Sequence, residues 1–199
     1  MSKTINGRTT KYDIDDQFLK RHSPRAMSGE KLSQEELMTL FEAARWAPSA
    51  SNIQPWRFIY AIRETPEFEN MFSCLVDFNK SWCKNAAALI VTISAKTSLS
   101  SKGEPRPNVT HSFDTGAAWE NLALQAFEMN LVAHGMSGFD FKKAAEVLGV
   151  PDDYNVEMMI AVGKPGKVEN LPEALRAMET PNDRRPLEET IFQGKFGAK

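Results

Sequence analysis

The sequence predicts an α+β fold in a single domain that spans residues 1–199. Three segments rich in aliphatic, aromatic and β-branched residues predict strands, and segments with helical periodicity lie between them. A chain of 199 residues, 42% of them hydrophobic, can bury one sizeable core. We find no internal repeat and no linker that would divide it.

The charge balance limits the classes of partner. Lys and Arg number 24 and Asp and Glu number 26, so the net charge of −2 argues against a general nucleic-acid binder. The polar N-terminus lacks the apolar core of a signal peptide, and the longest apolar stretch, residues 86–95, is too short to cross a bilayer as a helix. We therefore expect a cytoplasmic protein that binds neither nucleic acid nor membrane.

The first predicted helix begins at a capping box formed by Ser33 and Glu36. Apolar residues then recur at amphipathic spacing, at Leu37, Leu40, Phe41 and Ala44. Pro48 ends this helix, because the residue before a proline is pushed out of helical geometry.

Residues 56–62 (WRFIYAI), 86–95 (AAALIVTISA) and 156–162 (VEMMIAV) predict strands, the second of them buried and the third partly alternating. The Ser-, Gly- and Pro-rich residues 96–110 predict a loop, either a mobile lid or a disordered surface segment.

Residues 112–133 predict the longest helix, which is apolar on most sides and therefore buried in the domain or against a partner chain. Asp140 can cap a further helix that Gly149 closes. After Gly163 the chain is rich in proline and charge, and its tail is either loose or laid across a neighbour.

The cysteines and histidines predict no metal site. Cys74 and Cys83 do not form a C-x-x-C pair and are expected to be buried free thiols. His22, His111 and His134 lie far apart in the sequence, without the spacing of paired ligands. No P-loop or G-x-G-x-x-G motif is present, which disfavours a nucleoside-triphosphate enzyme or a Rossmann dehydrogenase.

Four segments carry groups that could bind a ligand. Residues 21–25 (RHSPR) offer two guanidinium groups, an imidazole and a hydroxyl, the donors that a phosphate monoester needs, although a solvated basic turn has the same composition. Residues 47–56 (APSASNIQPW) would let a flat ligand approach closely, or form an ordinary turn.

The other two segments lie later in the chain. Residues 134–140 (HGMSGFD) have glycines that leave backbone N–H groups open to a ligand, or simply connect two helices. Residues 182–187 (NDRRPL) hold an arginine pair, for which a surface position is the usual explanation.

Taken in order, these four segments resemble the nitroreductase family. The run R-H-S-P-R, then A-P-S-A-S-N-I-Q-P-W-R-F, then G-F-D, then R-R-P-L extends from about Phe18 to Leu187. The resemblance implies a nitroreductase-like fold, with a central mixed or antiparallel sheet flanked by helices. It also implies an intertwined homodimer with a C-terminal extension, in which the helix from Ser112 lies at the interface.

The resemblance further implies a set of FMN-binding residues. The phosphate and ribityl chain would be bound by Arg21, His22, Ser23, Pro24, Arg25 and Arg184, with Arg185 as the alternative to Arg184. The partner subunit would offer Pro48, Ser49, Ala50 and Asn52 to the flavin ring. The backbone beside flavin N5 would belong to Gly135, Met136, Ser137 and Gly138.

The implied activity is ping-pong transfer of hydride from NADH or NADPH, through FMN, to a small acceptor such as a nitroaromatic or a quinone. Arg25 is the candidate for stabilising the reduced ring, and no catalytic residue is assigned. Ser137 departs from the glutamate found there in larger members, and residues 68–85 match no motif. A non-catalytic FMN-binding or storage protein is the alternative, as are a reductive dehalogenase and an enone reductase on the same scaffold.

Overall fold

The computed structural model describes residues 3–198. Two compact units are present: unit 1, from residues 1–22 and 180–199, and unit 2, residues 23–179. The expectation of a single FMN-binding domain stays a prediction.

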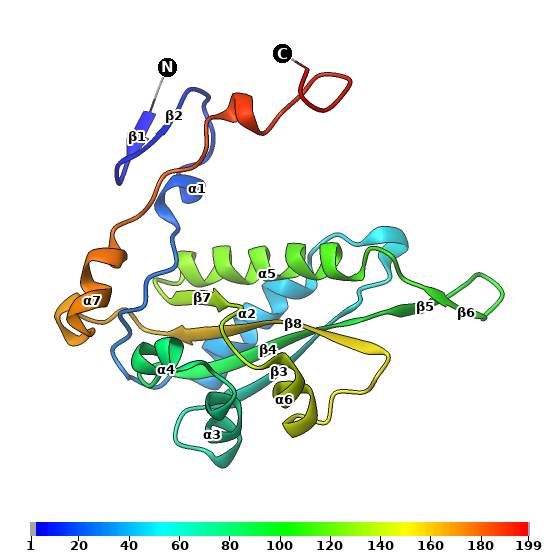
Figure 1. The fold of residues 1–199 in the computed structure, drawn as a ribbon, viewed down its shortest axis with the longest axis horizontal. Coiled ribbons are helices and arrows are strands. Elements are labelled where there is room, and N and C mark those ends of the chain that lie inside the picture. Colours follow the sequence, from blue (N-terminus) through cyan, green and yellow to red (C-terminus); the bar gives the residue numbers. More distant parts are fainter. Residues whose placement is uncertain (1–2, 199) are drawn as a thin grey trace. The chain divides into compact units, whose positions relative to one another are not determined.

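Unit 2 is built on a four-stranded antiparallel sheet, visible in Figure 1. Its strand order is β3 (Trp56–Ile62), β4 (Ala88–Ala95), β8 (Tyr154–Gly163) and β7 (Val132–Met136). Three of these strands confirm the predicted ones, with β4 starting two residues later and β8 slightly longer than expected. β4 is buried on both faces and is apolar except for Thr92 and Ser94.

Helices cover both faces of this sheet, and they confirm the α+β class. One face packs against α2 (Gln34–Arg45) and α5 (His111–Glu128). The other packs against α3 (Pro66–Ser73), α4 (Asp77–Cys83) and α6 (Phe141–Val147). Figure 1 shows α5 on one side of the sheet and α3 and α6 on the other.

Two predicted helix starts are confirmed. At α2 the Ser33 hydroxyl accepts from the Glu36 amide at 3.0 Å, and the Glu36 carboxylate accepts from the Ser33 amide at 2.6 Å. At α6 the Asp140 carboxylate accepts from the Lys143 amide at 2.9 Å. Cys74 and Cys83 are buried free thiols, as expected.

The prediction of one helix over residues 112–133 is wrong in its last turn. α5 ends at Glu128, Asn130 takes a left-handed φ of 55°, and the Leu131 amide donates to the Ala126 carbonyl at 2.8 Å. Residues 132–136 then form β7, which pairs with β8. The segment at His134 is therefore not a link between two helices, because sheet pairing outweighs the local helical pattern.

The segment at residues 96–110 is a hairpin rather than an irregular loop. β5 (Thr97–Leu99) pairs antiparallel with β6 (Pro105–Pro107). The Ser100 hydroxyl accepts from the amides of Lys102 and Glu104 across the turn. Prolines are tolerated in β6 because it lies at the edge of a two-stranded sheet.

Unit 1 contains a small hairpin, a short helix and the C-terminal segment. β1 (Lys3–Ile5) and β2 (Arg8–Thr10) are joined by Asn6 and Gly7, whose φ angles are 53° and 76°. Asn-Gly is the pair that a tight hairpin turn prefers. α1 (Gln17–Lys20) follows, and η4 (Leu187–Glu189) lies in the C-terminal segment.

The remaining elements of unit 2 are short. They are η1 (Ala50–Asn52), η2 (Val168–Asn170), α7 (Glu173–Arg176) and η3 (Ala177–Glu179). Among residues 3–198, no helix has both the length and the apolar character that crossing a bilayer requires.

Candidate functional site

Unit 1 brings two further arginines, Arg21 and Arg184, close to the buried side chain of Arg8. Arg8 is 4% exposed, and its guanidinium donates to the carbonyl oxygens of Arg21 at 2.5 Å and Leu19 at 3.1 Å. It also donates to the carbonyl oxygen of Asn182 at 2.8 Å. Arg8 thus ties together the two chain segments that carry the predicted phosphate ligands Arg21 and Arg184.

The charges of these arginines act on one another. Burial, together with the positive charges of Arg184 and Arg21, lowers the pKa of Arg8. Three like charges at one place favour binding of an anion. Arg8 escaped the sequence analysis, because nothing at residues 1–10 marks a contact to a position 174 residues away.

The two candidate C-terminal arginines are exposed. The Arg184 side chain donates to the Asn182 side-chain oxygen at 3.2 Å, and its amide donates to the Asp183 carboxylate at 2.8 Å. Arg184 is among the charges that lower the pKa of Arg8, and the choice between Arg184 and Arg185 as phosphate ligand stays a prediction.

In unit 2, Arg25 is held by an almost fully buried carboxylate. The Glu179 side chain is 6% exposed and accepts from the backbone amides of Arg25 and Ala26 at 2.9–3.1 Å. The Arg25 guanidinium lies 3.5 Å from Glu179 and 5.9 Å from the centre of the Phe78 ring. Among the described residues, the buried Nε of Arg25 has no hydrogen-bond partner.

Two side chains of α4 support the segment that begins at His134. Asn79 is 7% exposed and donates to the Gly138 carbonyl at 2.9 Å. The Trp82 ring lies 4.7 Å from the His134 ring, whose Nδ1 is 3.1 Å from the Pro24 carbonyl oxygen. Unit 2 therefore brings residues 23–25, α4 and β7 together, although residues 68–85 offered no motif to predict this.

The two glycines of this segment lie close to neighbouring side chains. A Cβ on Gly135 would lie 2.5 Å from the Met158 sulfur, and one on Gly138 would lie 2.5 Å from the Asn79 amide nitrogen. Met136 is buried in the core and pairs with Met159 in the sheet, while Ser137 is exposed.

Residues 48–52 form an exposed turn with unusual backbone angles. Ser51, Asn52 and Gln54 all have φ between 51° and 55°, in the left-handed region that costs energy for residues other than glycine. Asp114, which is 4% exposed, holds the turn by accepting from the Ala50 amide at 3.2 Å. Such strain often marks functional segments.

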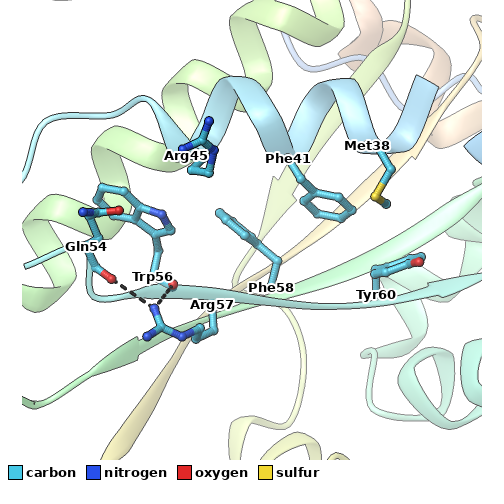
Figure 2. A pocket seen from close by; sticks show the side chains of 8 residues that line it. All are labelled: Met38, Phe41, Arg45, Gln54, Trp56, Arg57, Phe58 and Tyr60. Atoms are coloured by element: carbon cyan, nitrogen blue, oxygen red, sulfur yellow. Dashed lines mark hydrogen bonds between the residues drawn. The ribbon is translucent and has the colours of Figure 1, made fainter. Parts of the chain in front are cut away.

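A separate apolar pocket of about 430 Å³ lies between α2 and β3 (Figure 2). Its lining consists of Met38, Phe41, Arg45, Gln54, Trp56, Arg57, Phe58 and Tyr60. The Phe41 ring contacts the rings of Phe58 at 5.5 Å and Tyr60 at 5.3 Å. None of the predicted cofactor ligands lines this pocket.

Metal ligands do not gather in the described part of the chain: residues 3–198 contain no group of three or more His, Cys, Asp or Glu side chains placed to hold an ion. Guanidinium groups and serine hydroxyls dominate the polar side chains of the predicted site, with one imidazole and one amide side chain. Such a donor set suits a phosphorylated organic ligand.

Comparisons with known proteins agree with this donor set. A sequence model described as the Nitroreductase family matches residues 19–164. A crystal structure described as an oxidoreductase containing FMN is 42% identical, with a TM-score of 0.94, over 99% of this chain and 100% of that one.

Two curated proteins are more distant relatives. The enone reductase of CLA biosynthesis from Lactiplantibacillus plantarum is 26% identical over 76% of this chain and 85% of its own length. The oxygen-insensitive NADPH nitroreductase of Helicobacter acinonychis is 38% identical, over 32% of this chain and 30% of its own.

Proposed function

The chain belongs to the nitroreductase family, and from that premise we propose that it is an FMN-dependent oxidoreductase. It takes hydride from NADH or NADPH and passes it to a small oxidised acceptor such as a nitroaromatic or a quinone. The observation that carries this proposal is the cluster of Arg8, Arg21 and Arg184. The family match, which begins at residue 19, supports the same proposal.

The residues present fit FMN on two independent grounds. In the arginine cluster of unit 1, burial and the positive charges of Arg184 and Arg21 lower the pKa of Arg8 more than the Asp183 carboxylate raises it, so positive charge prevails there. In unit 2 the buried Nε of Arg25 lacks a partner among the described residues, although an arginine donor in such a position normally has one.

Each predicted ligand has a defined task. Arg21, His22, Ser23 and Arg184 would bind the phosphate and ribityl chain through charge-assisted and neutral hydrogen bonds. Arg25 would face the edge of the ring that becomes negative on reduction. When bound, FMN supplies hydride transfer between the nicotinamide donor and the acceptor.

The chain would act as a homodimer, in which residues 48–52 of one subunit cover the flavin of the other. The exposure of Pro48, Ala50, Ser51 and Asn52, together with the left-handed φ angles of Ser51 and Asn52, supports an intermolecular role for this turn. Donor and acceptor would use the same face of the ring in turn, which predicts ping-pong kinetics.

A spectrum of the purified protein tests the proposal. We expect a yellow protein that releases FMN on denaturation and whose flavin absorbance bleaches when NADPH or NADH is added without oxygen. A panel of nitroaromatics, quinones and enones would then identify the acceptor class, since one relative is named as an enone reductase.

A second candidate function, FMN storage without turnover, predicts a different result in the same spectroscopic experiment. The protein would be yellow, yet neither nicotinamide would bleach it. A colourless protein that does not take up added FMN would contradict both functions.

A further inference from the structure

Four polar side chains meet at the N-terminal end of α5. Ser94 lies near the end of β4, His111 and Ser112 begin α5, and Glu157 lies on β8. The register of β4 against β8 shifts between Thr92 and Ile93, so that Glu157 is an extra residue in a β-bulge. A bulge redirects a side chain, and bulges are frequent beside active sites.

Glu157 organises this cluster as an acceptor. Its carboxylate accepts from the Ser94 hydroxyl at 2.5 Å and the Ser112 hydroxyl at 2.7 Å. Burial raises the pKa of Glu157, but hydrogen bonds from Ser94, Ser112 and Asn155 and the charge of His111 outweigh it, so the pKa lies below its usual value. The carboxylate is therefore ionised and has no hydrogen to donate.

This arrangement fixes the tautomer of His111. Ser94 uses its one hydrogen toward Glu157, so its oxygen must accept from His111 Nδ1, which lies 2.7 Å away. The neutral imidazole then carries its hydrogen on Nδ1 and its lone pair on Nε2. Within residues 3–198, no hydrogen bond to Nε2 is found, and the side chain of His111 is 22% exposed.

The cluster is not a hydrolytic triad. Ser94 is 0% exposed and so cannot reach a substrate. Moreover, Ser94 and Glu157 both approach the same imidazole nitrogen, whereas a triad places nucleophile and acid on opposite nitrogens. What the cluster presents to the outside is the Nε2 atom of His111.

Nε2 lies at the end of unit 2 that carries residues 48–52. Asp114, one helical turn after His111, holds the Ala50 amide. Trp56, which follows the turn, pairs with Ser94 across the sheet. The segment that would cover the flavin and the His111 cluster are therefore built on the same first turn of α5.

We propose that His111 donates a proton to the acceptor, with Glu157 and Ser94 as positioning residues; this inference rests on the proposed function. A quinone that takes up a hydride from the reduced cofactor becomes an oxyanion and needs one proton. The Nε2–H bond of protonated His111 breaks, a hydroquinone O–H bond forms, and the electron pair stays on Nε2. Solvent then returns a proton to Nε2.

The tautomer is measured on the FMN-loaded protein by ¹⁵N NMR of the imidazole, with His111→Gln identifying the signals. We expect hydrogen on Nδ1 in the neutral form, and loss of this preference in Glu157→Gln and Ser94→Ala. Hydrogen on Nε2 in the wild-type protein, or an unchanged tautomer in both variants, would overturn the proposal.

Rapid-mixing kinetics then separate the two half-reactions. In His111→Gln, we expect reduction of FMN by NADPH to stay within twofold of the wild-type rate. Reoxidation by a quinone should slow at least tenfold, because a general acid typically accelerates proton transfer by about a hundredfold or more. Glu128→Gln is the control, since Glu128 is exposed at the opposite end of α5 and takes no part in the His111 cluster, so this variant should reoxidise at nearly the wild-type rate.

Equal slowing of both half-reactions, or unchanged reoxidation, would contradict a role for His111 with the acceptor. If NADPH does not reduce the wild-type protein, the proposed function itself fails, which is a different result. Bound FMN and the unfolding midpoint show whether His111→Gln has folded, and His111→Asn replaces it where it has not.

Discussion

The guanidinium of Arg8 donates to the backbone carbonyl oxygen of Arg21 across 2.5 Å. A second donor of the same guanidinium reaches the Asn182 carbonyl oxygen, two residues before Arg184. One buried side chain thus sets the spacing of two chain ends that are far apart in sequence. The proposed phosphate anchor depends on this bridge as well as on its own arginines.

Changing Arg8 should therefore weaken FMN binding without removing a phosphate ligand. A lysine keeps the charge but cannot form the fork of hydrogen bonds, so Arg8→Lys should cost about 1.5–3 kcal/mol of FMN affinity, the scale for one hydrogen bond to a charged group. Fluorescence titration of the apoprotein with FMN measures this. The exposed Lys11→Arg change in the same unit is the control, and equal affinities of Arg8→Lys and wild type would exclude the bridge as a determinant.

Direct ligands should behave differently from the bridge. Arg21→Ala and Arg184→Ala should each weaken FMN binding by about 1.5–3 kcal/mol, because each removes a charged hydrogen bond to phosphate. Arg185→Ala serves as the neighbouring control and should bind FMN almost as the wild type does. Titration with riboflavin, which lacks the phosphate, should show little difference among the three variants; a large loss there would place these arginines elsewhere on the ligand.

The Asn79–Gly138 contact predicts an asymmetry between two glycines. In Gly138→Ala, the new methyl group would collide with the Asn79 amide, which is fixed by its bond to the Gly138 carbonyl. We expect a loss of about 1–3 kcal/mol in the free energy of unfolding, as overpacking costs. Gly135→Ala meets the flexible end of Met158 instead and should lose less. Urea unfolding compares them, and a smaller loss at Gly138 would be contrary to the model.

His134 should make stability depend on pH. Burial lowers its pKa below the ordinary 6.5, against the opposing effect of its hydrogen bond to Pro24. Between the lowered folded pKa and about 6.5 the unfolded chain binds more protons, so the free energy of unfolding should fall as pH falls through this window, by at most about 1.4 kcal/mol per pH unit. His134→Gln should flatten this slope in urea titrations from pH 7.5 to 5, while an identical slope would rule out His134 as its source.

The capping box at Ser33 should contribute measurably to α2. Ser33→Ala leaves the Glu36 amide without its acceptor, so we expect a loss of about 1 kcal/mol in the free energy of unfolding. Ser33→Asp retains an acceptor oxygen and should stay near the wild-type value. Thermal or urea unfolding decides the point, and equal stability of the alanine and aspartate variants would show that the cap is not needed.

Elements governed by neighbours in the chain could be predicted without the structure. The capping box at Ser33 and the N-cap at Asp140 satisfy backbone groups within three residues, and the strand at residues 56–62 follows from its own aromatic and β-branched content. The Asn6–Gly7 turn has an equally local pattern, because Asn-Gly readily takes the left-handed φ angles of a tight hairpin.

The candidate site also has a part that could be predicted from the sequence and a part that could not. Its residue types, and their order along the chain, determined the family resemblance that the comparisons confirm. The roles of Arg8, Asn79, Asp114 and Glu179 were not predictable, because each one supports a segment that lies far away in sequence.

By itself, therefore, the sequence determined the α+β class, the family, three strands of the four-stranded sheet and the starts of α2 and α6, all of which depend on composition and short-range hydrogen bonding. Tertiary structure alone decided that residues 132–136 form a strand, because the backbone of β8 offers them a partner that no neighbouring residue reveals. It also decided which buried side chains hold the proposed ligands, since such contacts arise only when distant segments pack together.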